Sequence, residues 1–76
     1  MPGRLPSDLP RARVVRALNR LGFVLQREGG LHSIFRDPHD PSRLISLPRH
    51  SRIKRRLLRG ILSGVGITES DFMSRY

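Results

Sequence analysis

Apolar residues recur with helical spacing in two stretches of the chain. In the first stretch, Val14, Leu18 and Leu21 lie at positions i, i+4 and i+7, which predicts a helix over residues 8–21. The second stretch, residues 53–65, has a broader apolar face and predicts a second helix. The apolar positions of this second helix are Ile53, Leu57, Leu58, Ile61, Leu62 and Val65.

Between the two predicted helices, the chain changes to short apolar or alternating segments that are bounded by turn residues. This pattern is typical of strands. The predicted strands are residues 23–27, 31–36 and 43–47. Gly29-Gly30 separates the first two and indicates a hairpin turn. On the second strand, His32 and Phe35 fall on opposite faces, and we expect Phe35 to face the core.

The order of helix, three strands and helix predicts an α+β fold of the α-β-β-β-α type. We expect a three-stranded antiparallel sheet that packs on two helices, as in double-stranded RNA-binding domains. A chain of 76 residues is sufficient for one small domain. Residues 1–6 are expected to be a disordered lead-in, and residues 7–76 a single domain. A last short helical turn is expected after Thr68, with Phe72 folding back on the core.

The charge balance of the sequence indicates what kind of partner the protein binds. Fifteen Lys and Arg residues stand against six Asp and Glu, and Lys54 is the single lysine. Because arginine binds two phosphate oxygens at once, we expect a polyanionic partner, with nucleic acid ahead of an acidic protein or a membrane surface. The absence of cysteine excludes disulfides, thiolate zinc sites and a thiol nucleophile. No apolar run approaches the roughly 18 residues of a membrane span, and no signal-peptide core is present, so a cytoplasmic protein is expected.

Five short features occur in an order that resembles the HicA toxins. They are Leu21-Gly22-Phe23, Gly30-x-His32-x-Ile34-Phe35, Leu47-Pro48-x-His50, a basic helix, and Gly66-Ile67-x-x-x-x-Phe72. Proteins of this family are small endoribonucleases of toxin–antitoxin pairs, so the resemblance implies a double-stranded-RNA-binding-domain-like fold and metal-independent cleavage of mRNA. It also implies a protein partner, the HicB antitoxin, that covers the active site. Leu31 stands where the family usually has a serine, and Glu28 or Gly29 where a basic residue is often found.

The resemblance also implies that His32 is the catalytic residue. RNA supplies its own nucleophile, the 2′-hydroxyl, and histidine as a residue type transfers protons near neutral pH. From the residues alone, the favoured interpretation of His32 is an exposed strand histidine that only contacts RNA, and it is the resemblance that favours catalysis. A non-catalytic RNA-binding module of the same fold, favoured by Leu31 and Glu28, is therefore the alternative. The spacing of His32, His39 and His50 matches no metal-ligand pattern, so we expect neither a metal nor another cofactor.

Basic residues surround the predicted hairpin and crowd the start of the second helix. Arg27 and Arg36 flank His32 on two strands that are expected to pair, and Gly30 would let the backbone approach a phosphate closely. The predicted RNA-binding residues are Arg27, Gly30, Arg36, Arg49, His50, Arg52, Lys54, Arg55 and Arg59. The three phenylalanines are all predicted to be core residues, which favours recognition of RNA backbone and shape over base stacking.

Overall fold

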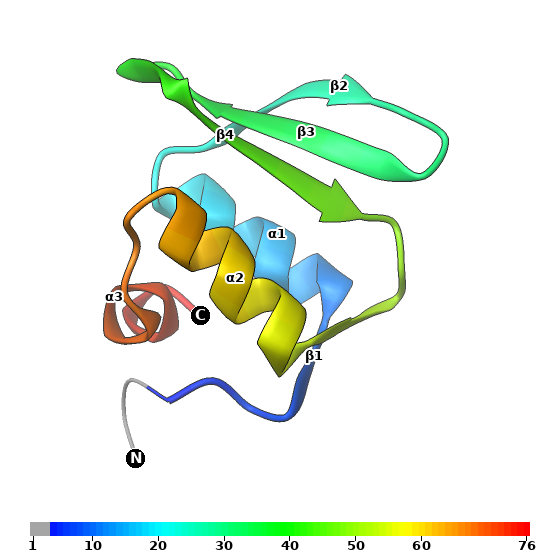
Figure 1. Cartoon of the computed structure of the whole chain (residues 1–76), viewed down its shortest axis with the longest axis vertical. Helices are drawn as coiled ribbons and strands as arrows, with labels where there is room; N and C mark the ends of the chain where they lie inside the picture. Colours follow the sequence, from blue (N-terminus) through cyan, green and yellow to red (C-terminus); the bar gives the residue numbers. More distant parts are fainter. Residues whose placement is uncertain (1–3) are drawn as a thin grey trace.

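A three-stranded antiparallel sheet lies across a pair of helices in the computed structural model, which describes residues 4–76 (Figure 1). The elements in chain order are β1 (Asp8–Pro10), α1 (Arg11–Arg20), β2 (Val24–Glu28), β3 (His32–Asp37), β4 (Asp40–Pro48), β5 (Arg52–Lys54), α2 (Arg55–Gly64) and α3 (Glu69–Ser74). The strand order of the sheet is β2-β3-β4, and α1 and α2 lie beneath one of its faces. The predicted α+β fold, with three antiparallel strands and two packed helices, is confirmed.

The structure adds two short strands that the sequence pattern did not predict. β1 and β5 form an antiparallel pair in which Leu9 lies opposite Ile53, and both side chains are fully buried. The predicted helices over residues 8–21 and 53–65 were therefore wrong at their starts, because each begins only after one of these strands. Pro10 explains the first correction, since a proline disfavours helical conformation in the residue before it.

The N-terminal segment contributes to the core. Residues 1–3 of the predicted lead-in lie outside the described residues. Leu5 is only 1% exposed, and its backbone N–H donates a hydrogen bond to the Glu69 carboxylate at 3.3 Å. Leu5, which the sequence analysis assigned to the lead-in, thus packs with the core, and the division of the chain at residue 7 stays a prediction.

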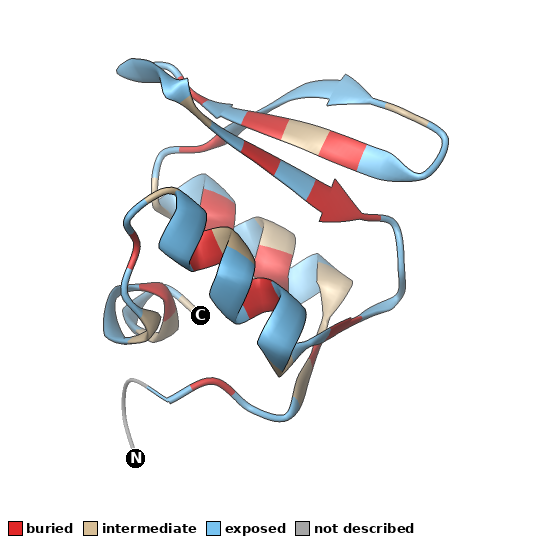
Figure 2. Ribbon diagram, in the orientation of Figure 1, coloured by how far each residue is buried: buried red, intermediate tan, exposed pale blue. Residues whose placement is uncertain are grey.

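The two faces of β3 differ as predicted (Figure 2). Ser33 and Phe35 point to the helices and are buried, whereas His32 and Arg36 point away and are exposed. The buried core beneath the sheet consists of Leu5, Leu9, Val14, Ala17, Leu18, Phe23, Phe35, Ile45, Leu47, Ile53, Leu58, Leu62, Ile67 and Phe72. All three phenylalanines are therefore core residues, as expected, and His32 and Arg36 are left to form a surface.

Local turn signals fix the ends of the helices. Gly22 follows α1 with a φ angle of 101°, and Gly66 follows α2 with a φ angle of 74°. Residues other than glycine rarely adopt this backbone conformation. The Thr68 hydroxyl accepts a hydrogen bond from the Asp71 N–H at 3.0 Å and so caps α3. Because α3 then directs Phe72 into the core, the predicted C-terminal helical turn is confirmed.

Candidate active site and nucleic-acid interface

His32 is the first residue of β3 and lies at the turn of the β2–β3 hairpin, with its side chain exposed. Its backbone carbonyl accepts a hydrogen bond from the Gly29 N–H at 2.8 Å, which closes the turn. A Cβ at position 29 would lie 3.1 Å from the same carbonyl oxygen, so the turn is tight at this glycine. On the other side, His32 lies opposite Pro48 of β4. Its place on the exposed sheet face is therefore fixed by both neighbouring strands.

Two adjoining surface hollows share His32. The first has a volume of about 390 Å³ and is lined by Gly30, Leu31, His32, Pro48, Arg49 and His50. The second has a volume of about 350 Å³ and is lined by Arg27, Gly29, Gly30, Leu31, His32 and Ile34. The structure thus brings together five residues that the sequence analysis selected, namely Arg27, Gly30, His32, Arg49 and His50. Leu31 lies between the two hollows and is 79% exposed.

A hydrogen-bond network lies behind His32. The Ser33 side chain is completely buried, and its hydroxyl donates to Oε1 of Glu28 at 2.9 Å and accepts from the Arg11 guanidinium at 2.5 Å. Arg11 also donates to the Pro48 carbonyl at 3.1 Å. The network therefore connects the start of α1 to all three strands of the sheet.

Sequence reasoning missed this network, although one signal for it was present. Ser33 is a polar residue at an inward position of a strand, between the apolar Ile34 and Phe35 and the exposed His32. A buried hydroxyl needs hydrogen-bond partners inside the protein. That requirement predicts nearby polar groups, but it does not say that they are Arg11 and Glu28.

Arg49 fastens the segment after β4 to the hairpin turn. Its backbone N–H donates to the Leu31 carbonyl at 3.0 Å, and its guanidinium donates to the Gly29 carbonyl at 3.1 Å. The same guanidinium lies 3.6 Å from Oε2 of Glu28, as an ion pair at the surface. The positive charge of Arg49 at the first hollow is therefore partly balanced by Glu28.

The other predicted RNA-binding residues do not line the two hollows. Arg36 is exposed on the same sheet face as His32, opposite Val24 of β2. Arg52, Lys54, Arg55 and Arg59 instead lie on β5 and α2. Two of them form ion pairs, Arg52 with Asp8 and Arg59 with Glu69 at 2.9 Å, and Arg55 donates to the Pro6 carbonyl at 3.2 Å.

The carboxylates in these contacts have lowered pKa values. The hydrogen bond from Arg52 lowers the pKa of Asp8 below its ordinary value of 3.8. The backbone N–H of Leu5, followed by the Arg59 guanidinium, lowers the pKa of Glu69 below its ordinary value of 4.5. Several arginines around α2 are therefore engaged within the protein, in contrast to a surface of unpaired cations.

His39 and the acidic residues give no sign of a metal centre in the described part of the chain. His39 is exposed in the β3–β4 turn, where its backbone N–H donates to the Asp37 carboxylate at 2.9 Å. Within residues 4–76, no three His, Cys, Asp or Glu side chains gather closely enough to hold a metal ion. In the same residues, no helix is long and apolar enough to cross a membrane.

Comparison with known families decides how this geometry is interpreted. The family model described as the HicA toxin of bacterial toxin–antitoxin systems matches residues 11–67, well over half of the chain. The chain belongs to the HicA toxin family. The matched range includes α1, the three-stranded sheet and α2, and therefore both hollows around His32. No curated protein matches the chain.

Membership of the HicA family supports the role of a toxin and implies an antitoxin as the partner. HicA toxins are in general of the ribonuclease type. The five motifs that resemble this family in the sequence extend from Leu21 to Phe72, and the family match covers all of them except the last residues. The resemblance is thereby confirmed at the level of the family.

Proposed function

We propose that this HicA-family chain is an endoribonuclease that cleaves mRNA without a metal ion and uses His32 for proton transfer. The observation that carries the proposal is the position of His32, which is exposed at the junction of two hollows lined by Arg27 and Arg49. A phosphodiester placed there would have an imidazole and two guanidinium groups within the same surface region. Because the site is open, the RNA itself would form its other wall.

The proposed reaction needs only the groups that this surface offers. The imidazole of His32 accepts the proton of the ribose 2′-hydroxyl as the 2′-oxygen attacks the adjacent phosphorus. A bond from phosphorus to the 2′-oxygen forms, and the bond to the 5′-oxygen of the next nucleotide breaks. The departing 5′-oxygen takes up a proton from solvent water, which reaches this open site, so the products are a 2′,3′-cyclic phosphate and a 5′-hydroxyl. Arginine side chains stabilise the charge that develops on the phosphate oxygens.

RNA binding in this proposal depends on phosphate contacts. Phe23, Phe35 and Phe72 are buried, so none of them offers a surface for base stacking. Arg27 and Arg36 are exposed on the sheet face that carries His32. This supports recognition of backbone and shape, in keeping with the double-stranded-RNA-binding-domain-like interpretation, with mRNA in the cytoplasm as the substrate and a HicB antitoxin as the protein that covers the site.

The proposal is tested by incubating the purified protein with an end-labelled mRNA in the presence of EDTA. Cleavage that persists in the chelator and is lost in His32→Ala supports the mechanism. General acid–base groups typically contribute about 10²–10⁴ in rate, so the loss should be easy to measure. His39→Ala is the matched control, because His39 is also exposed but lies in the β3–β4 turn. Equal cleavage by His32→Ala and the parent would contradict the assignment.

One observation favours a second function, a non-catalytic RNA-binding module. Glu28 reaches Arg49 and places a negative charge beside the first hollow, where a phosphate would otherwise meet an unpaired cation. A gel shift without cleavage by the parent would select this alternative. If Glu28→Gln then gained cleavage, the negative charge of Glu28 would be identified as the cause of the low activity.

A further inference from the structure

β4 is an edge strand, and its outer side has no strand partner in residues 4–76. The Arg49 N–H donates to the Leu31 carbonyl at 3.0 Å, and in an antiparallel ladder such pairs recur at every second residue. The alternate residues Leu44 and Ser46 therefore direct their backbone N–H and C=O groups away from β3. An open edge of this kind is a template for another strand.

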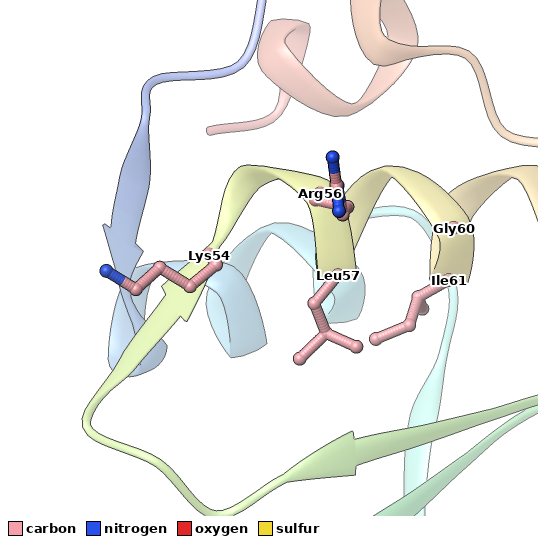
Figure 3. Close-up of a pocket in the computed structure, with 5 residues that line it drawn as sticks. All are labelled: Lys54, Arg56, Leu57, Gly60 and Ile61. Carbon is pink, nitrogen blue, oxygen red and sulfur yellow. The ribbon is translucent and has the colours of Figure 1, made fainter.

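On the same side of the molecule, α2 carries an apolar hollow of about 600 Å³ (Figure 3). Leu57 is 39% exposed there, and Ile61 is half-buried. Gly60 lies between them in the middle of the helix, where a glycine costs about 1 kcal/mol relative to alanine. A Cβ at position 60 would meet no atom within 4 Å, so packing inside the protein does not require this glycine. Its effect is to keep the floor of the hollow flat and open.

The open edge and the apolar hollow belong to neighbouring elements. β4 runs alongside α2 in both views, and the side chains of Leu57 and Ile61 point from α2 toward the side on which β4 lies (Figures 1 and 3). A strand that paired with the outer edge of β4 would extend the sheet past the helices. Its alternate side chains would then point toward α2, where Leu57 is exposed and Ile61 is half-buried.

The charge of this surface indicates the chemistry of the segment that would occupy it. Lys54 and Arg56 border the hollow, and neither forms an ion pair with another residue of the described chain. A second copy of the chain, itself with a net charge of +9, would bring like charges together at this edge. Carboxylates on the incoming segment would instead pair with these two cations.

We propose that the outer edge of β4 and the apolar hollow of α2 form a docking site for an extended, acidic segment of a partner protein. The segment adds to β4 as a fourth strand through the backbone groups of Leu44 and Ser46. It places an apolar side chain against Leu57 and Ile61 and its carboxylates near Lys54 and Arg56. This surface is separate from the hollows at His32, so the proposal does not depend on the catalytic role of that residue.

The test uses a synthetic nine-residue peptide, with blocked ends, in which valine or leucine alternates with glutamate. The peptide is titrated into the ¹⁵N-labelled protein, and amide shifts and hydrogen exchange are measured. The expected result is saturable binding that slows exchange of the Leu44 and Ser46 amides at least tenfold. A peptide with lysine in place of glutamate should not bind. Absence of protection at both amides in millimolar acidic peptide, or formation of a dimer by the protein alone, would overturn the proposal.

Two substitutions separate this docking site from the RNA site. Ser46→Pro removes an outward N–H but leaves the ladder to β3 intact, and Leu57→Glu places a negative charge in the hollow. Both should weaken peptide binding at least tenfold and leave RNA binding and cleavage unchanged. Ser63→Glu, an exposed position on the same helix, is the matched control and should bind the peptide like the parent. If Ser46→Pro fails to fold, Leu57→Glu decides, and parental peptide affinity in that variant would refute the proposal.

Discussion

The Arg11 guanidinium donates to the buried hydroxyl of Ser33, and through it the first residue of α1 is connected to the strand that carries His32. The Ser33 hydroxyl in turn donates a hydrogen bond to Glu28. Glu28 forms an ion pair with Arg49, which lies in the segment that leads to His50. One polar network thus connects the two chain segments that line the hollows at His32. Its integrity should matter to both stability and function.

Replacing Ser33 with alanine should destabilise the protein by about 1–3 kcal/mol. The substitution leaves the Arg11 guanidinium and the Glu28 carboxylate without their shared partner in a partly buried place. Urea unfolding monitored by circular dichroism measures the change. Ser51→Ala, at an exposed position outside the network, is the control and should lie within about 0.5 kcal/mol of the parent. Equal stability of the two variants would show that the network contributes little.

Replacing Phe35 with alanine should cost about 3–5 kcal/mol, because the ring is 2% exposed and the cavity would form at the centre of the sheet. In a domain of this size, that loss is a large part of the total stability. Thermal unfolding should therefore show a fall in Tm of many degrees. Val24→Ala removes a side chain that is 50% exposed and should change Tm only slightly. A small effect in both variants would contradict the assignment of the two sheet faces.

Replacing Arg36 with glutamine should weaken the binding of all RNAs alike and flatten its salt dependence. For each phosphate of a single-stranded RNA that the protein no longer neutralises, the slope of log affinity against log salt becomes shallower by about 0.7. Arg59→Gln should have a smaller effect on RNA, because Arg59 already pairs with Glu69 at 2.9 Å. Filter binding at several salt concentrations compares the two. A larger loss of affinity from Arg59→Gln would place the RNA on α2 in preference to the sheet face.

The stabilisation that the Glu69 carboxylate gives to the folded state should be lost in acid. Its pKa in the folded state lies below the ordinary value of 4.5, chiefly through the hydrogen bond from the Leu5 N–H. A carboxylate with a lowered pKa stabilises the folded state fully above the ordinary value, and this stabilisation is lost as the pH falls through the folded-state value. Stability measured between pH 6 and pH 3 should therefore fall less steeply in Glu69→Gln than in the parent. Identical slopes would exclude a role for this carboxylate.

The sequence predicted the elements whose signals are local and repeated. The helical period of Val14 and Leu18, the alternation around Phe35, and the capping residue Thr68 each act over a few neighbours, so they could be recognised without the structure. The hairpin turn at Gly29-Gly30 is of the same kind. These signals were sufficient to predict correctly that His32 lies on the exposed face of the sheet.

The features that sequence reasoning missed depend on interactions between distant residues. β1 and β5 have three residues each, too few to show an alternating pattern, and they pair only because the fold brings Leu9 to Ile53. The arginines near α2 had the appearance of a free basic surface. Whether Arg59 meets a carboxylate depends on α3, which places Glu69 beside it. A charge count contains no information of this kind.

The pairing of β1 with β5 also determines the order in which the molecule is completed. β1 is synthesised before the three-stranded sheet, yet its partner strand lies more than forty positions later in the chain, where Lys54 pairs with Asp8. Closing so long a loop has an entropic cost that local hairpins avoid, so the β2–β3–β4 meander is expected to form first. During translation, β1 therefore stays unpaired until β5 has been made. A nascent toxin would have the hairpin of His32 in place before β1 and β5 pair.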